Sequence, residues 1–163
     1  MAYREMFAEE QWLTLQKAIA WIFEYVSSSD GKVDKKEFKS LEKLISKPSA
    51  YSSTLTQEVI SSIPNSEVLL ALKGQDPRAL KEGLDDFAKI IDYTLSKGEA
   101  FDVKKDYIAM GMFVAESSSG LFGNKVNYEE FDSLAEIGVV INIPVKHLLE
   151  TSMVDSIVAK LSE

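Results

Sequence analysis

The chain has 163 residues, of which 45% are hydrophobic and 27% are charged, and its formal net charge is -8. This length and composition are typical of one globular domain with its own core, and the acidic balance argues against nucleic-acid binding, which needs a basic patch. The absence of cysteine excludes disulfides, iron–sulfur clusters and cysteine nucleophiles, and it fits a cytoplasmic location.

Apolar residues recur at helical spacing along most of the chain. In the first such segment they fall at Trp12, Leu15 and Ile19, and Asp30–Gly31 ends the helix. The pair Asp76–Pro77 predicts a further helix start, because Asp is a good N-cap and Pro suits the first helical position. In chain order, helices are predicted at about 12–26, 35–46, 52–62, 65–73, 76–98, from 101 into the second serine run, 128–137 and 144–161.

One segment, EIGVVINI (136–143), has a strand-like density of β-branched residues. A lone strand would have no partner, so we interpret this segment as a helix end followed by a buried connector. The aromatic residues Trp12, Trp21 and Phe23 lie at helical spacing and indicate a core face. The sequence therefore predicts an all-α fold, with a single domain of about seven to eight helices over residues 1–163.

Two stretches of the chain carry nearly the same phrase. The stretch KVDKKEFKSLEKLI (32–45) aligns with KVNYEEFDSLAEIG (125–138), and each follows a helix that ends in three serines. This pattern predicts two pseudo-repeated helix–loop–helix units, at about 12–46 and 102–138, with a longer loop in the second unit.

Helix initiation explains most of the shared residues. Asp34 and Asn127 suit the N-cap position, and Glu37 and Glu130 stand three residues further on, where a capping box places its acid. A valine before each cap and a phenylalanine after it can form a hydrophobic staple. The repeat thus has a structural reason that requires no ligand.

The first unit also offers carboxylates for a metal ion. When Gly31 is aligned with the invariant glycine of an EF-hand loop, Asp30, Asp34 and Glu37 take the fifth, ninth and twelfth positions. The first position falls on Val26, which cannot bind a metal, so we expect a weak divalent-cation site, for Ca²⁺ or Mg²⁺, in place of a complete calcium hand. The counterparts in the second unit are Glu116, Asn127 and Glu130, and its loop supplies fewer acids.

The phrase EYVSSSDGKVDKKEF resembles the core signature of the tellurite-resistance TerB-like family. In that signature a helix rich in small residues runs into Asp-Gly, a hydrophobic residue and an acidic helix start. The second phrase, AESSSGLFGNKVNYEEF, matches in outline but lacks the Asp-Gly pair. The resemblance covers 25–45 and, less closely, 112–137. It implies an all-helical domain with internal pseudo-symmetry, a role in stress and metal-oxyanion resistance, and divalent-metal binding.

Other candidate groups are isolated. His147 is the single histidine, so it cannot build a histidine-rich metal site, and we interpret it as a surface or half-buried helix residue. In the loop GLFGN, Leu121 and Phe122 are apolar, and they either anchor the loop on the core or form a contact with a partner or a membrane. No phosphate-loop or dinucleotide fingerprint is completed there.

These observations leave three functional hypotheses. The first is a non-enzymatic TerB-like scaffold or sensor in a stress response, with a weak divalent-metal site. The alternative is an acidic protein-interaction module without a metal, and an enzyme ranks third because no complete active site can be assembled. In the first two cases we expect a protein partner. We expect neither a signal peptide nor stable membrane insertion, since the longest apolar run, IGVVINIPV, stops at Pro144.

Overall fold

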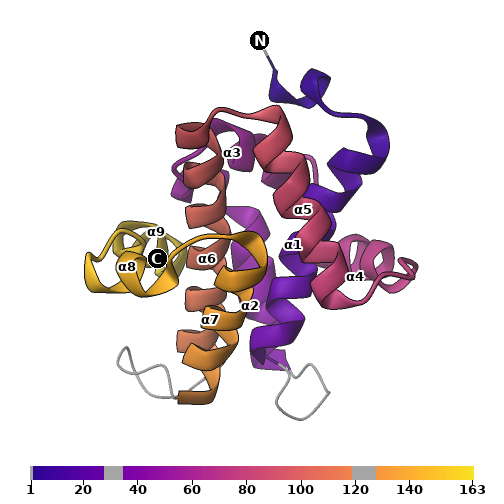
Figure 1. Ribbon diagram of the computed structural model, residues 1–163. Coiled ribbons are helices and arrows are strands. Elements are labelled where there is room, and N and C mark those ends of the chain that lie inside the picture. The colour runs from indigo at the N-terminus through magenta and orange to yellow at the C-terminus, as the bar shows by residue number, and fades with distance from the viewer. Residues whose placement is uncertain (1, 28–34, 119–127) are drawn as a thin grey trace.

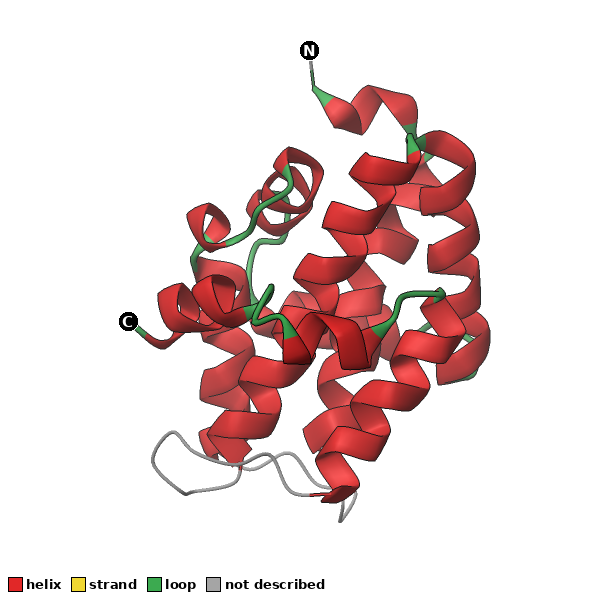
Figure 2. Cartoon of the chain, turned by 60° about the vertical axis from the view of Figure 1, so that its left-hand side comes forward, coloured by secondary structure: helices red, strands yellow, loops and turns green. Residues whose placement is uncertain are grey.

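The computed structural model describes residues 2–27, 35–118 and 128–163, and of residues 118 and 128–131 it describes the backbone alone. Within these ranges the regular structure is entirely helical, which confirms the all-α prediction (Figures 1 and 2). In chain order the elements are η1 (Tyr3–Met6), α1 (Glu9–Ser27), α2 (Lys35–Ser46), η2 (Pro48–Ala50), α3 (Thr54–Ser61), α4 (Ser66–Gly74), α5 (Leu80–Thr94), α6 (Lys97–Ser118), α7 (Tyr128–Ile141), α8 (Val145–Glu150) and α9 (Asp155–Ser162).

The two longest helices, α1 and α6, pack against each other in the centre of the molecule (Figure 1). Tyr107 of α6 is fully buried, and its hydroxyl donates a 2.7 Å hydrogen bond to the carbonyl of Leu15 in α1. Trp12, Trp21 and Phe23 are buried as predicted. The core therefore forms between two helices whose apolar residues continue around most of their circumference.

The remaining helices cover this central pair. Helix α5 packs on α1 and α7, whereas α2 and α9 pack on α6. Gly111 of α6 permits a close approach, because a Cβ there would lie 2.6 Å from a methyl carbon of Leu134 in α7. The buried apolar residues form one contiguous cluster. None of the helices in the described ranges combines the length and apolar character that crossing a bilayer would require.

The predicted helix start at Asp76–Pro77 is wrong. Helix α5 begins at Leu80, after a non-helical linker. The Asp76 carboxylate instead accepts hydrogen bonds from the backbone N–H and the guanidinium of Arg78, at 2.9 and 3.0 Å. A local turn of this kind competes with helix capping for the same aspartate oxygen, and here the turn forms.

The predicted boundary at Gly98 is also wrong. Helix α5 ends at Thr94, and Gly98 lies in the first turn of α6, so α6 begins before the expected start at Phe101. Ser96 and Glu99 form a reciprocal capping box, in which each backbone N–H donates to the other side chain at 3.2 Å. The cap stabilises the α6 start strongly enough to include the glycine.

Two differences occur near the C-terminus. Helix α7 continues to Ile141, past the predicted end at residue 137, and Asn142 then adopts a left-handed backbone with a φ of 60°. The predicted single helix over 144–161 is divided into α8 and α9, with Ser152 between them at a φ of 58°. The turn allows Leu148 and Leu161 both to be fully buried, which a straight helix would not favour.

The helix pairs α1–α2 and α6–α7 occupy the two predicted repeat units, 12–46 and 102–138. In each pair a long helix precedes a shorter one. That the two pairs are copies of one another stays a prediction.

Candidate functional site

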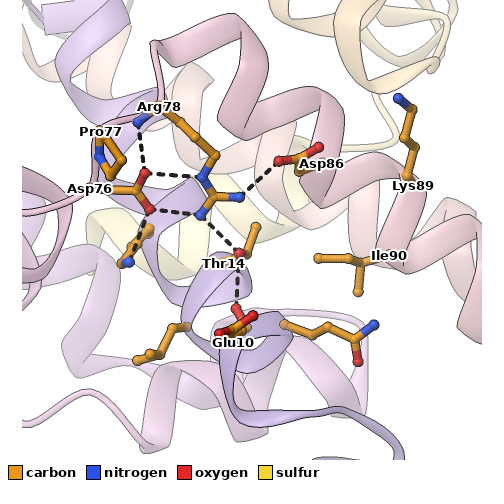
Figure 3. Close-up of a pocket in the computed structure, with 11 residues that line it drawn as sticks. Glu10, Thr14, Asp76, Pro77, Arg78, Asp86, Lys89 and Ile90 are labelled. Atoms are coloured by element: carbon orange, nitrogen blue, oxygen red, sulfur yellow. Dashed lines mark hydrogen bonds and ion pairs between the residues drawn. The ribbon is translucent and has the colours of Figure 1, made fainter.

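A groove of about 630 Å³ lies between α1 and α5 (Figure 3). Its walls come from the N-terminal half of α1, from the linker that precedes α5, and from α5 itself. Acids and bases are balanced along it, with Glu10, Asp76 and Asp86 against Lys17, Arg78 and Lys89. The other lining residues are Gln11, Leu13, Thr14, Pro77 and Ile90.

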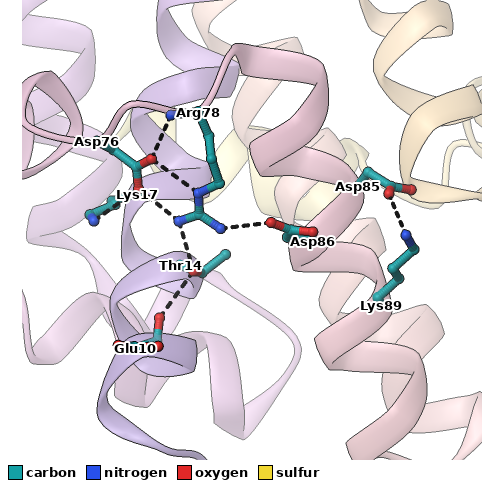
Figure 4. A network of polar contacts seen from close by, with 8 residues as sticks. All are labelled: Glu10, Thr14, Lys17, Asp76, Arg78, Asp85, Asp86 and Lys89. Atoms are coloured by element: carbon teal, nitrogen blue, oxygen red, sulfur yellow. Dashed lines mark hydrogen bonds and ion pairs between the residues drawn. The ribbon is translucent and has the colours of Figure 1, made fainter.

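Arg78 is the centre of the polar network in this groove (Figure 4). Its guanidinium binds Asp76 through two parallel hydrogen bonds, Nε to Oδ1 at 3.0 Å and Nη2 to Oδ2 at 2.7 Å. It also donates to Asp86 at 2.9 Å and to the Thr14 hydroxyl at 3.0 Å. A planar guanidinium is suited to this paired geometry, in which lysine could make only one of the two bonds to the carboxylate.

Asp76 is the most deeply buried charge of the network, with a side chain 3% exposed. Besides Arg78, it accepts a 3.0 Å hydrogen bond from Lys17. The hydrogen bonds from Arg78 lower the pKa of Asp76 far below its ordinary value of 3.8, although burial alone would raise it. A carboxylate held this firmly in its ionised form is a poor general base.

Packing around Trp21 explains the position of this polar network between α1 and α5. The Arg78 guanidinium carbon lies 5.2 Å from the centre of the Trp21 ring, within range of a cation–π contact. Gly83 of α5 faces the same indole, and a Cβ at this position would come within 2.4 Å of the ring. The glycine thus lets α5 lie directly on Trp21, and Arg78 covers the ring from the preceding linker.

The network joins α1, the linker and α5, and its charges neutralise one another. It contains neither a nucleophile beside a free base nor an excess of one charge for a ligand. We therefore assign it a structural role, in which it attaches the start of α5 to α1. Sequence reasoning missed it because Lys17 and Thr14 are separated from Asp76 and Arg78 by about sixty residues, as the residue numbers show.

Asp106, in α6, is a second buried carboxylate that the sequence did not reveal. It is fully buried and accepts hydrogen bonds from the backbone N–H groups of Ser52 and Ser53, at 2.8 and 2.9 Å, and from the Ser52 hydroxyl at 2.8 Å. Burial raises its pKa above 3.8 despite these bonds. The carboxylate fixes the chain before α3 onto α6, which is again a structural contact.

The predicted metal ligands lie partly outside the described ranges. Asp30, Asp34 and Asn127 do so, as does the side chain of Glu130. The apolar pair at 121–122 also belongs to the residues that are not described. In the part of the chain that the structure describes, no three Asp, Glu or His residues form a group that could hold a metal ion.

Two predicted ligands are described, and both are partly buried. Glu37 stands in the first turn of α2, and Glu116 stands near the end of α6. Burial raises the pKa of Glu116, and the negative charge of Asp155 in α9 raises it further. His147 is exposed on α8, which selects the first of the two positions, surface or half-buried, that the sequence left open.

Two further grooves open on the surface. One, of about 680 Å³, lies beside Trp12, and its charged groups, Arg4 and Glu58, have partners: Arg4 pairs with Glu9, and Glu58 accepts the Tyr3 backbone N–H at 2.8 Å. The other, of about 410 Å³, lies between α2 and the start of α4, and we call it the α2–α4 groove. It is lined by Phe38, Glu42, Ile45, Ser46, Ile63, Pro64, Asn65, Ser66 and Glu67.

No protein-family model, curated protein or solved structure matches the chain. The TerB-like resemblance therefore stays a hypothesis that rests on the two short phrases of the sequence.

Proposed function

We propose that the chain is a non-enzymatic helical scaffold that acts by binding a protein partner. The TerB-like resemblance implies a part in stress resistance, and a scaffold is the first hypothesis for that part. Partner binding is also the role of the alternative, an interaction module without a metal. The observation that supports it is the α2–α4 groove, where buried and half-buried apolar side chains line a hollow beside two exposed acids, Glu42 and Glu67.

The comparison with the other grooves favours this surface. The α1–α5 groove has equal numbers of acids and bases, and the groove beside Trp12 has one of each. In the part of its lining that the structure describes, the α2–α4 groove has two acids and no basic residue. A charge without a partner at a concave, partly apolar surface is free to meet a charge on another protein.

Site-specific photo-crosslinking tests this proposal. A photoreactive phenylalanine analogue at Ser46, which is exposed and lines the groove, should crosslink one defined partner in cells that produce the protein. The same analogue at Glu82, exposed on α5 and outside the three grooves described above, is the matched control. The partner is then purified, and its affinity is measured by calorimetry for the wild type and for Ser46→Trp and Glu82→Trp.

We expect Ser46→Trp to weaken the partner at least tenfold by occupying the groove, and Glu82→Trp to leave its affinity unchanged. Equal crosslinking from both positions, or a partner indifferent to Ser46→Trp, would contradict the proposal. Turnover of a substrate that is abolished by a single carboxylate substitution would contradict its non-enzymatic part.

A divalent-cation sensor is the second proposal, and the position of Glu116 favours it. Its carboxylate is half-buried and feels the negative charge of Asp155, so a cation nearby would relieve the repulsion between two acids. Ca²⁺ or Mg²⁺ added to chelated protein should raise the melting temperature, since a ligand that binds the folded state stabilises it.

The variants for this test come from both predicted ligand sets. Glu116→Gln, and separately Asp30→Ala with Asp34→Asn, should reduce the rise in melting temperature, whereas Glu82→Gln should not. Asparagine is as good an N-cap as aspartate, so Asp34→Asn keeps the cap that the sequence predicts at position 34, and a lost response would report the metal and not the cap. If no ion shifts the melting temperature, the interaction module without a metal is the better description.

A further inference from the structure

We infer that the α2–α4 groove binds a basic amphipathic segment of the partner protein, with an apolar side chain in the groove and Lys or Arg beside it. The inference rests on the proposed function and specifies the chemistry of the segment that the groove recognises. Its evidence is the apolar lining and the two exposed acids of that lining, which have no ion-pair partner among the described residues.

The apolar part of the groove comes from two elements that the chain folds together. Phe38 and Ile45 stand seven residues apart on one face of α2, and both are half-buried. Ile63 and Pro64 complete the lining from the linker between α3 and α4. The cavity, of about 410 Å³, is of a size that takes one large side chain and part of its neighbours.

The charge of the groove selects the flanking residues. Glu42 and Glu67 are exposed, and among the described residues neither has an ion-pair partner. Lys39 and Lys43 flank Glu42 on α2, so a cation near α2 meets repulsion as well as attraction. Glu67, at the start of α4, therefore supplies the larger share of the attraction.

An anionic ligand is the competing interpretation, because the groove contains the N-terminus of α4. The Asn65 side chain already caps this helix, accepting the Val68 N–H at 2.9 Å. A helix N-terminus carries about half a positive charge, whereas Glu42 and Glu67 carry two negative charges between them. Lys39 and Lys43 lie outside the lining and offset the charge of Glu42. The preference for a cation therefore rests on Glu67, whose full negative charge exceeds the half charge of the helix N-terminus.

Synthetic peptides provide the probe for this inference. The first is a helical 15-residue peptide with one Phe on its apolar face and Lys at the flanking positions. The second has Glu in place of each Lys, and the third has Ala in place of the Phe. Binding is measured by fluorescence anisotropy at low and high salt, and the contact surface is mapped by amide chemical shifts of the full chain.

We expect the Lys peptide to bind, to shift amides of α2 and of the α4 start, and to weaken in high salt. Each exposed ion pair contributes only a small factor to the affinity, so the double variant Glu42→Gln with Glu67→Gln should bind the Lys peptide about five- to tenfold more weakly. The single variant Glu67→Gln should account for most of this loss. The control Glu82→Gln should have no effect. The other two peptides should bind at least tenfold more weakly.

Equal binding of the Lys and Glu peptides, shifts that map elsewhere, or full affinity of the double variant would overturn the inference. Its failure is distinguishable from that of the proposed function. A partner that crosslinks through Ser46 but presents a neutral or acidic segment would sustain the scaffold role and refute the basic segment. The absence of a crosslinked partner would refute the scaffold role itself.

Discussion

Replacement of Arg78 by methionine is expected to lower the free energy of unfolding by about 3 kcal/mol. The change removes the guanidinium that joins Asp76, Asp86 and Thr14, and it keeps an unbranched side chain that can still cover Trp21. The folded state thereby loses the main contact between the α5 linker and α1.

The magnitude follows from how much each partner is buried. Asp76 is 3% exposed, and removal of one partner from a buried ion pair costs about 3–5 kcal/mol. Lys17 still donates to Asp76 at 3.0 Å, so the lower end of that range applies. Asp86 is 41% exposed, and a pair of this kind adds less than about 1 kcal/mol.

Urea unfolding followed by tryptophan fluorescence measures this loss. With a slope of about 1–3 kcal/mol per molar urea, the midpoint should fall by roughly 1–3 M. Lys89→Met is the matched control, since it removes the exposed pair with Asp85 from the same groove and should leave the midpoint unchanged. In an Asp76→Asn background Arg78→Met should cost less, because the buried charge that it would strand is already absent.

A loss below about 1 kcal/mol for Arg78→Met would refute the assignment of a structural role to this network. The same loss in the wild-type and Asp76→Asn backgrounds would show that the two side chains are not coupled. If the loss is small and a ligand binds in the α1–α5 groove, the network would have to be reconsidered as a binding site.

Two further predictions concern backbone space and pH. In thermal melts, Gly83→Ala should destabilise the fold by about 1–3 kcal/mol, because the new Cβ would meet the rigid Trp21 ring. Gly98→Ala should stabilise the fold by about 0.5–1 kcal/mol, because Gly98 is helical and the space around its Cβ position is open. Carboxyl NMR should find the pKa of Asp76 below 3.8 and that of Asp106 above it. The lowered pKa of Asp76 stabilises the folded state at pH values above about 4, and this stability is lost as the pH falls towards the pKa of Asp76 in the folded state. The raised pKa of Asp106 has the opposite effect on stability, because it disfavours the ionised carboxylate in the folded state. A raised pKa for Asp76 and a lowered pKa for Asp106 would contradict the surroundings described for these two carboxylates.

Much of the fold could be predicted because the signals are local. The helices α1, α2, α3 and α4 follow from apolar periodicity and from breakers such as Pro48 and Pro64. The errors occur where one residue can serve two local structures. Asp76 suits an N-cap and also a turn, and Gly98 suits a helix end and also a well-capped helix start. Contacts with distant residues and caps decide between these options.

The candidate sites could be predicted less well, because they depend on residues far apart in the chain. In the sequence Asp106 looks like one of several charged residues in the first half of α6, directly after two lysines. Its partners, Ser52 and Ser53, are more than fifty positions away. The α2–α4 groove likewise brings together Phe38 and Ile45 of α2 with Glu67 of α4, which are separated in the sequence by the whole of α3. No spacing rule within a single segment connects such residues.

The amino-acid sequence by itself determined that this protein is helical, acidic and built around apolar helix faces, one of which carries Trp12, Trp21 and Phe23. Helix formation depends on side chains three and four positions apart, and a sequence displays those neighbours directly. The tertiary structure alone decided which charges neutralise one another and which are left exposed. Arg78 is compensated by Asp76, whereas among the described residues packing brings no ion-pair partner to Glu67.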